Sequence, residues 1–517
     1  MSQTRRMTRG GFQSLLWYRM GIALIILVQL WLILNTILSK SRGSMVLQMV
    51  LTGISIFAAL HAMARKDKGA YKLTMVFLVL LVPLFGGVFY WLFNAQMTSK
   101  GLQKQLDEIE KSGKYAFLLL SDSYEKACET ASEHQTEIRY LQKYNGFPVY
   151  QHTQTHYCSS GEESFACMLR AMEQAERYIF LEYFIVAEGV MWDSILDVLK
   201  RKADAGVDVR IIYDDLGCFL LLPTNYHETL RSMGIKAQVF NPFRPFLTTV
   251  QNNRNHRKIL SVDGKVAFTG GVNLADEYIN QKLRFGHWKD GSIMLEGYAA
   301  WSFTVMFLEM WSLLAKEEER YEDYLPWQGE GCWVAHDGFV QPYSDSPMDR
   351  ENVSEHVYLR LIEKAQEYLY ITTPYLVPDD SIISALILAA KSGVDVRIIT
   401  PHIPDKKLVH FVGRSYYREL IAAGVRIYEY EKGFIHTKSF VSDDKVATIG
   451  TVNLDYRSLY LHFECGTWLY GSQAVHEVKE DFLSILGSCK QMREEDCRAN
   501  VIVRLCQDAL RIFAPLI

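Results

Sequence analysis

The chain has 517 residues, more than a single hydrophobic core usually serves, because single cores stop growing near about 250 to 300 residues. We therefore expect at least two folding units. Its 55 Lys and Arg face 59 Asp and Glu, so the net charge of −4 offers no global basic field to attract a nucleic acid. The 9 cysteines are odd in number, scattered and without a CxxC pair, which argues against a disulfide framework or a structural zinc site.

Three long apolar stretches, almost free of charge, lie near the N-terminus. They cover residues 20–38, 45–64 and 73–94. Each approaches or exceeds the roughly 20 residues that a helix needs to cross a hydrocarbon layer about 30 Å thick. We therefore predict a membrane anchor over residues 1–110 with two or three transmembrane helices, in a multi-pass protein of the cell membrane. The alternatives are a cleaved signal peptide for the first stretch and a re-entrant or core helix for the second, which is the least apolar.

The charges that flank these stretches bear on the orientation of the anchor. Four arginines precede the first stretch, namely Arg5, Arg6, Arg9 and Arg19, and Arg65, Lys66, Lys68 and Lys72 separate the second from the third. Both basic clusters favour the cytoplasm, and three crossings then place the rest of the chain outside. Cysteines without evident pairing fit an oxidising compartment poorly. The sequence therefore leaves the side of the membrane open.

The chain beyond the anchor contains the same unit twice. Each unit begins with a buried strand, at Tyr178 and at Tyr368, and continues with an amphipathic helix, over 192–205 and 381–392. An identical heptapeptide, Gly-Val-Asp-Val-Arg-Ile-Ile, follows both helices and is typical of a helix end that leads into a parallel strand. A second helix and a further strand complete each unit.

This alternation predicts an α/β fold with two packed lobes, each a mixed or parallel sheet flanked by helices. We assign the lobes to residues 111–335 and 336–517. The segment 324–347, with its glycines and Pro342, is interpreted as the connection between them. The C-terminal stretch 501–517 is amphipathic, and it either docks on the second lobe or touches the membrane surface.

Each unit ends in the same set of polar residues at the same spacing. The first set is His256, Lys258, Asp263, Gly271 and Asn273, and the second is His436, Lys438, Asp443, Thr451 and Asn453. On a strand, His and Lys two positions apart point the same way, and a Gly-Gly or Gly-Thr turn brings the backbone close to an anion. One His-x-Lys is usually structural, but two copies at equal spacing in duplicated halves indicate a phosphoryl-transfer site.

The paired motifs resemble the HxKxxxxDxxxxxxGxxN motifs of the phospholipase D superfamily over nearly the whole chain beyond the anchor. The segments 252–258, 273–280, 285–290 and 453–458 and the hydrophobic N-terminus are similar to bacterial cardiolipin synthases. The resemblance implies two phospholipase D-like lobes and a phosphotransferase that needs neither metal nor cofactor. It also implies phosphatidylglycerol, cardiolipin and the lipid bilayer as partners, and no nucleic acid.

The resemblance further implies a role for each residue of the motifs. One histidine forms a phosphohistidine with a phosphatidyl group, while the other protonates the leaving glycerol and then deprotonates the incoming hydroxyl. His256 is the expected nucleophile and His436 the acid and base, although the motifs alone do not distinguish them. The expected phosphate-binding groups are Lys258, Lys438, Asn273 and Asn453, beside the turn residues Gly271 and Thr451.

Each histidine also needs a carboxylate that orients its ring, so a later acid is expected in each repeat. In the family pattern Asp290 and Glu464 occupy these places. Asp263 and Asp443 belong to the catalytic motif, but each lies 7 residues after its histidine. An odd separation puts them on the opposite face of a strand, which suggests a supporting role.

The leading hypothesis is transfer of a phosphatidyl group between two phosphatidylglycerol molecules, giving cardiolipin and glycerol. A phospholipase D-type hydrolase, or a transphosphatidylase that uses another alcohol, would pass through the same intermediate. A nuclease is disfavoured by the acidic balance and the apolar stretches. A membrane scaffold with a decayed site is disfavoured because both motifs are intact. The sequence does not indicate an oligomeric state.

Overall fold

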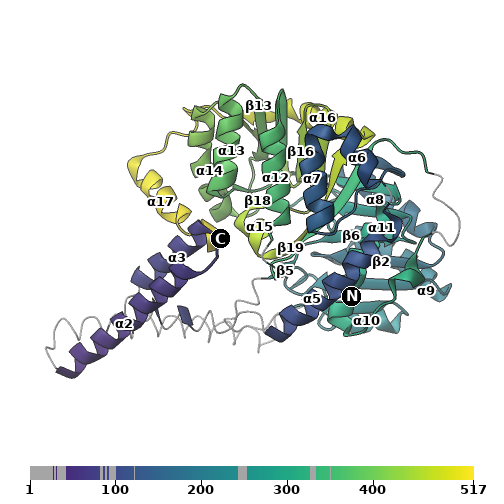
Figure 1. Cartoon of the computed structure of the whole chain (residues 1–517), viewed down its shortest axis with the longest axis horizontal. Helices are drawn as coiled ribbons and strands as arrows, with labels where there is room; N and C mark the ends of the chain where they lie inside the picture. The colour runs from purple at the N-terminus through teal and green to yellow at the C-terminus, as the bar shows by residue number, and fades with distance from the viewer. Residues whose placement is uncertain are drawn as a thin grey trace.

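The computed structural model of the protein contains two helix-flanked β-sheets side by side, from which a helical hairpin protrudes (Figure 1). It describes residues 27, 31, 42–81, 86–87, 90–91, 100–121, 123–242, 253–326, 334–349 and 351–516. The predicted pair of α/β lobes is confirmed.

The first sheet has 7 strands in the order β1-β9-β7-β6-β2-β3-β4. They are β1 (Thr153–Cys158), β2 (Tyr178–Tyr183), β3 (Asp208–Asp214), β4 (Lys236–Phe240), β6 (Lys258–Val262), β7 (Val266–Gly270) and β9 (Ser292–Gly297). β2, β3 and β4 run parallel because helices connect them, whereas β6, β7 and β9 pair antiparallel. A short turn joins β6 to β7, and a longer segment that contains β8 (His287–Lys289) leads from β7 to β9. The sheet is therefore mixed.

The second sheet has 9 strands and repeats this order as β10-β19-β17-β16-β11-β13-β14, with β20 added at the end and β5 (Arg254–Asn255) paired to β19. The strands are β10 (Phe339–Asp345), β11 (Tyr368–Thr372), β13 (Asp395–Pro401), β14 (Arg426–Tyr430), β16 (Ser439–Ser442), β17 (Val446–Gly450), β19 (His462–Tyr470) and β20 (Cys489–Gln491). Equal strand order in both sheets is the structural counterpart of the sequence repeat.

Helices at the predicted places connect the parallel strands. α9 (Val190–Asp204) leads into β3 and α13 (Asp380–Lys391) into β13, and each ends just before the heptapeptide glycine. α11 (Ala300–Ala315) is apolar on all sides and almost fully buried, as a central core helix is. α5 (Lys100–Phe117) packs against it, and the indole of Trp301 donates to the carbonyl of Ala116 over 2.8 Å.

The predicted connection between the lobes is wrong in part. Residues Phe339–Asp345 form β10, which pairs along its length with β19. Pro342 has no N–H to donate, and it is accommodated because β10 lies at the edge of its sheet. Proline and glycine alone therefore misled the interpretation of this segment.

The N-terminal apolar region is described in part. Within the described residues, α2 (Arg42–Ala64) contains one stretch, Met45–Ala64, that is long and apolar enough to cross a membrane. The stretch 20–38 lies almost wholly outside the described residues. Of the stretch 73–94, the structure describes the end of α3 (Gly69–Leu81) and residues 86–87 and 90–91, all helical. A multi-pass anchor stays a prediction.

The C-terminal helix α17 (Val501–Arg511) docks on the second lobe. Arg511 pairs with Glu419 of α14 (Lys407–Ala422) at 2.7 Å, and the amide of Gln507 donates to the carbonyl of Phe411. Another face of α17 leaves large apolar side chains exposed, so docking accounts for only part of its amphipathic character. These side chains are Val501, Ile502 and Leu505.

Candidate active site

Both motif histidines lie where the chain changes its pairing partner from one lobe to the other. His256 follows β5, which pairs with β19 of the second repeat, and its N–H donates to the carbonyl of Phe463 over 2.9 Å. His436 follows β15 (Gly433–Ile435), which pairs with β8 (His287–Lys289) of the first repeat. The backbone N–H of His436 donates to the carbonyl of Lys289 over 2.7 Å. The backbone of each histidine is thus held by the opposite repeat.

This position corrects the expectation of a His-x-Lys motif on a continuous strand. His256 precedes the first residue of β6, and His436 lies in the break between β15 and β16. Both lysines are buried, and each Nζ donates to the carbonyl of the histidine two residues before it. His and Lys are therefore neighbours through this hydrogen bond rather than through strand alternation.

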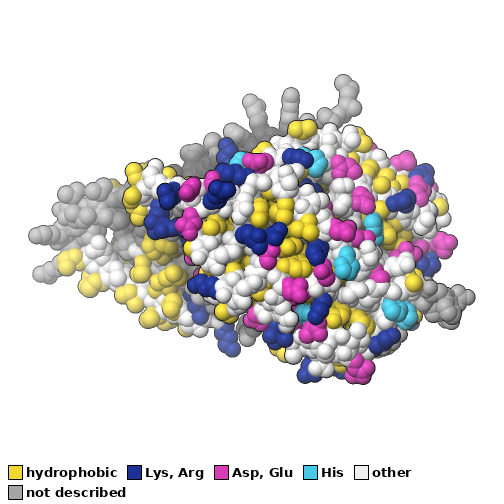
Figure 2. All heavy atoms as spheres, turned by 90° about the horizontal axis from the view of Figure 1, so that it is seen from above, with side chains coloured by type: hydrophobic (Ala, Val, Ile, Leu, Met, Phe, Trp, Pro, Cys, Tyr) yellow, Lys and Arg dark blue, Asp and Glu magenta, His cyan; other side chains and the backbone are white. Residues whose placement is uncertain are grey.

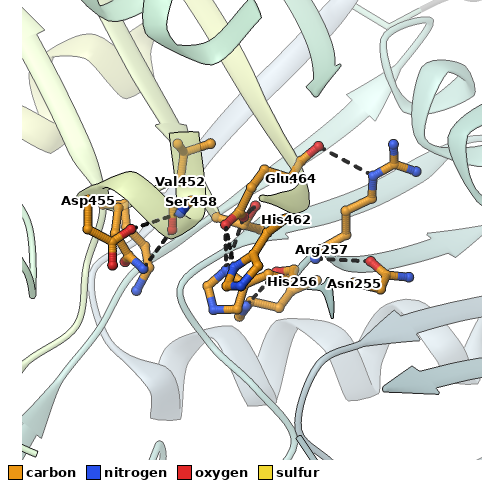
Figure 3. A network of polar contacts seen from close by, with 12 residues as sticks. Asn255, His256, Arg257, Val452, Asp455, Ser458, His462 and Glu464 are labelled. Atoms are coloured by element: carbon orange, nitrogen blue, oxygen red, sulfur yellow. Dashed lines mark hydrogen bonds and ion pairs between the residues drawn. The ribbon is translucent and has the colours of Figure 1, made fainter. Parts of the chain in front are cut away.

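The carboxylates that orient the histidines also cross between the repeats. His256 Nδ1 lies 2.9 and 3.0 Å from the two oxygens of Glu464 (Figure 3). His436 Nδ1 lies 2.8 Å from Oδ2 of Asp290. The sequence predicted one acid in each repeat, and the structure pairs each acid with the histidine of the other repeat. Each of the two motif histidines is therefore oriented by an acid of the other lobe.

Gly271 and Thr451 occupy equivalent turns but serve the two acids differently. A β-carbon at Gly271 would overlap the Asp290 carboxylate and crowd the carbonyl of His436, so only glycine leaves room for this pair. Thr451 instead donates its hydroxyl to Glu464, and the same oxygen accepts from the N–H of Cys465 over 3.0 Å. The Glu464 carboxylate therefore has an additional donor beside its histidine.

Burial and like charge keep both imidazoles neutral. Desolvation, followed by Lys258, Lys438 and His436, holds the pKa of His256 well below its ordinary value. Desolvation and Lys438 lower the pKa of His436 to about 4, although Asp290 opposes them. The pKa of Asp290 is lowered by His436 in spite of its burial. Each site thus contains a neutral ring that can accept a proton or attack an electrophile.

Burial also lowers the pKa values of the two motif lysines, so it disfavours their charged forms. Desolvation lowers the pKa of Lys258 to about 8, and Glu464 opposes this shift. Desolvation lowers the pKa of Lys438 to about 7, with Asp290 opposing and Lys258 contributing. The other three basic groups of the two motifs act electrostatically on His256, so all four lie in one region. Two adjacent desolvated ammonium groups favour an anion there.

The two motif asparagines are used to order the loops beside the histidines. Asn273 accepts from the N–H of Ile185 over 3.0 Å and donates to the hydroxyl of Tyr278 over 2.7 Å. Asn453 donates to the hydroxyl of Ser458 over 3.0 Å, and its buried Oδ1 has no hydrogen-bond partner among the described residues. Direct contact of either amide with a phosphate stays a prediction.

The structure does not bring Asp263 and Asp443 to the histidines. Asp263 lies at the β6–β7 turn with a φ of 52°, and its carboxylate accepts from the N–H groups of Glu176, Arg177 and Tyr178 over 2.8 to 2.9 Å. Asp443, with a φ of 57°, accepts in the same way from residues 366–368. Both aspartates were expected among the catalytic groups, and this expectation is corrected. Each carboxylate instead fixes its turn to the start of the neighbouring central strand.

Sequence reasoning missed several residues that surround the histidines. His462 lies two residues before Glu464 on β19, with its Nδ1 3.8 Å from that acid and its ring 5.6 Å from His256. Aromatic rings also contact the histidines, namely Phe184 at His256 and Tyr278, Trp288 and Phe434 at His436. The His-x-Glu spacing on a strand was the available signal for His462, because side chains two apart share a face.

The ligand atoms of His256, His462 and Glu464 lie within 4.8 Å of one another, which would also suit a cation. This donor set includes an expected catalytic histidine. The prediction of a reaction without metal therefore stays a prediction, for which removal of metal is the test.

The turn aspartates provide a prediction about stability. Asp263→Asn keeps a residue that tolerates positive φ but removes the charge that three N–H groups share, so we expect the free energy of unfolding to fall by about 2 kcal/mol. Asp443→Asn should cost less, since Asp263 is 4% exposed and Asp443 is half-buried. Thermal unfolding in detergent measures both. Unchanged stability of the Asp263 variant would contradict the structural role.

Comparison with known proteins agrees with this geometry. A family model described as cardiolipin synthase, PLD-like domain, matches residues 168–284 and 358–486. The chain is 42% identical over 446 residues to an uncharacterised protein of Streptococcus mutans, with 86% of this chain and 96% of that protein covered. It is 34% identical over 469 residues to a cardiolipin synthase of Geobacillus kaustophilus, with 89% of this chain and 92% of that protein covered. It is 33% identical to cardiolipin synthase 2 of Bacillus cereus, with 86% of each protein covered.

A solved structure shares the fold at low sequence identity. The crystal structure of phosphatidylserine synthase from Haemophilus influenzae superposes with a TM-score of 0.56 at 17% identity, over 74% of this chain and 98% of that one. The doubled sheet is therefore common to both proteins. With the relatives above, which span most of its length, the chain belongs to the cardiolipin synthase family of proteins with phospholipase D-like domains.

Proposed function

We propose that this protein is a cardiolipin synthase, which transfers the phosphatidyl group of one phosphatidylglycerol to another and releases glycerol. The observation that carries the proposal is the pair of neutral imidazoles, each oriented by a carboxylate of the opposite repeat, in one electrostatic environment with two buried lysines. Phosphodiester exchange needs a nucleophile, a proton donor and cations, and this site contains all three.

In the first step His256 Nε2 attacks the phosphorus of a phosphatidylglycerol. A P–N bond forms, the P–O bond to the headgroup glycerol breaks, and His436 gives a proton to the departing oxygen. His436 must carry that proton beforehand, and the bound anionic phosphodiester favours its uptake because a nearby negative charge raises a histidine pKa. Lys258 and Lys438 stabilise the negative charge on the non-bridging oxygens.

In the second step a hydroxyl of another phosphatidylglycerol enters where glycerol left. His436, now neutral, takes the proton of this hydroxyl, the oxygen attacks phosphorus, and the P–N bond to His256 breaks. Cardiolipin leaves with no net consumption of protons. The anchor keeps the site beside both lipid substrates, in a membrane protein that we divide into the anchor 1–110 and the lobes 111–335 and 336–517.

The unequal pKa shifts of the two histidines support the choice of nucleophile. Desolvation and the neighbouring basic groups hold the pKa of His256 well below its ordinary value. Asp290 opposes the lowering of the His436 pKa by its charge and by its hydrogen bond. His436 is therefore the easier ring to protonate, as an acid must be, and His256 stays neutral for attack.

Replacement of either histidine should abolish the reaction. We expect His256→Ala and His436→Ala each to lower cardiolipin formation by about 10³-fold or more, because each removes an obligatory reactant or proton carrier. The assay follows phosphate-labelled phosphatidylglycerol in detergent, with cardiolipin, phosphatidate and free glycerol measured together, with and without a metal chelator.

The same assay separates the alternatives. Phosphatidate as the only labelled product would indicate a hydrolase, and loss of activity with the chelator would contradict a reaction without metal. Label retained on the His436 side chain of the His256 variant would reverse the assigned roles.

The crossed pairing predicts that an acid of the second lobe controls the histidine of the first. Glu464→Gln keeps the shape of the side chain but removes the charge that orients His256, so transfer should fall by about 10²- to 10⁴-fold. Glu480→Gln, an exposed glutamate of α16 (Gln473–Leu486), is the matched control and should retain full activity. Equal activity of the two variants would show that Glu464 does not act on His256.

The lysine pKa values predict the alkaline limit of activity. A lowered lysine pKa means that the charge is lost as pH rises, so kcat/KM should fall between about pH 7 and 8 as Lys438 and then Lys258 lose their protons. Lys438→Arg keeps its charge throughout this range. It should move the first fall in kcat/KM to about pH 8. A pH profile identical to that of the wild type would exclude Lys438 as the titrating group.

A further inference from the structure

The described residues of the third apolar stretch do not lie along one straight helix. α3 is described as far as Leu81, and residues 86–87 and 90–91 follow it in the chain. Beyond the end of α3, Gly86 lies against the backbone of Val79. Gly87 lies against α2, where its N–H donates to the hydroxyl of Ser55 over 3.3 Å. The chain has therefore folded back beside the two helices that precede it.

The residues that follow lie further along α2, toward its C-terminal end. The hydroxyl of Tyr90 is 2.7 Å from Nδ1 of His61, and the ring of Trp91 lies 4.9 Å from His61 and 5.9 Å from Phe57. Between Gly87 and Tyr90 the contacts advance from Ser55 to His61, which is the direction in which α2 itself runs. The third stretch thus returns toward the end of the hairpin at which α3 began.

That end of the hairpin is the one attached to the second lobe. Lys68, in the loop between α2 and α3, lies 2.5 Å from Glu355 and 3.7 Å from Asp379, and its ammonium lies 5.1 Å from the ring of Tyr460. Glu355 is buried, so this pair is a docking contact rather than a solvated surface pair. The loop and the lobes therefore occupy the same side of α2.

The C-terminus adds a second attachment. The hydroxyl of Thr74 in α3 donates to the carbonyl of Ile512 over 2.5 Å, and Phe77 contacts the ring of Phe513 at 5.5 Å. Most large apolar side chains of α2 are exposed, and hydrophobic side chains gather on the protruding hairpin in Figure 2. The helix α17, which has an exposed apolar face of its own, precedes this attachment in the chain.

The geometry points to a re-entrant third stretch, with both lobes on the cytoplasmic face of the membrane. The stretch 20–38 and α2 then make two crossings, and both basic clusters fall on the side of the lobes. Each cluster has 4 basic residues, whereas Lys40 and Arg42 alone flank the opposite end of α2. If the proposed function holds, the substrate phosphatidylglycerol is taken from the inner leaflet.

Cysteine labelling tests this arrangement. Cys506 of α17 is exposed, whereas the other described cysteines are buried or half-buried. Lys66→Cys marks the hairpin loop and Gly43→Cys the far end of α2, where a new side chain meets no neighbour. Each is made in a background with Cys506→Ser and Cys332→Ser, and Cys506 is read in the full chain carrying only Cys332→Ser. A membrane-impermeant maleimide is applied to protoplasts and to inside-out vesicles.

We expect Cys506 and the loop cysteine to be labelled only in inside-out vesicles, and the Gly43→Cys variant only in protoplasts. Labelling of Cys506 and the loop from opposite sides would show that the third stretch crosses, which overturns the proposal. Labelling of both only from outside would overturn the cytoplasmic assignment. The pattern does not depend on turnover, so cardiolipin formation by the same variants tests the proposed function separately.

Discussion

The hydrogen bond between each histidine and a carboxylate of the other repeat is the contact on which the rest of the site depends. A buried imidazole needs a partner at Nδ1 to fix its tautomer and leave Nε2 free. In this fold the backbone N–H of each histidine is also bound by the opposite repeat, at Phe463 and at Lys289. Ring and backbone therefore lose their partners together when the lobes separate, which makes lobe packing a condition for chemistry.

Lobe packing also removes the basic groups of the site from water, and this desolvation changes their charge. The two histidines and two lysines lie together out of water, where like charges repel strongly and the uncharged forms are favoured. The site therefore binds an anion without holding a full set of permanent charges. In the proposed mechanism the substrate phosphate would supply negative charge to the site, and its binding would be coupled to protonation of His436.

The repeat in the sequence predicted much of the fold, because equal spacing of strands, helices and motif residues requires equal topology. It did not predict the crossing of Asp290 and Glu464, since periodicity describes order within a lobe and not contact between lobes. His462 was missed because a single His-x-Glu has no repeat partner to distinguish it. Asp263 and Asp443 shared the motif spacing for a different reason, as their carboxylates hold the turn that precedes the next strand.

The N-terminal anchor shows the same limit of a prediction made from the sequence alone. Hydropathy counts residues 73–94 as one crossing because their composition suits lipid, but it contains no information on a return. The contacts of Gly87 with Ser55 and of Tyr90 with His61 contain that information. Counting two crossings instead of three removes the conflict between the basic flanks and the cysteines, whose spacing in the sequence indicates no disulfide framework. The charge rule and the redox argument then favour the same compartment. In the proposed arrangement the hairpin would meet the second lobe at the leaflet that supplies the lipid substrate.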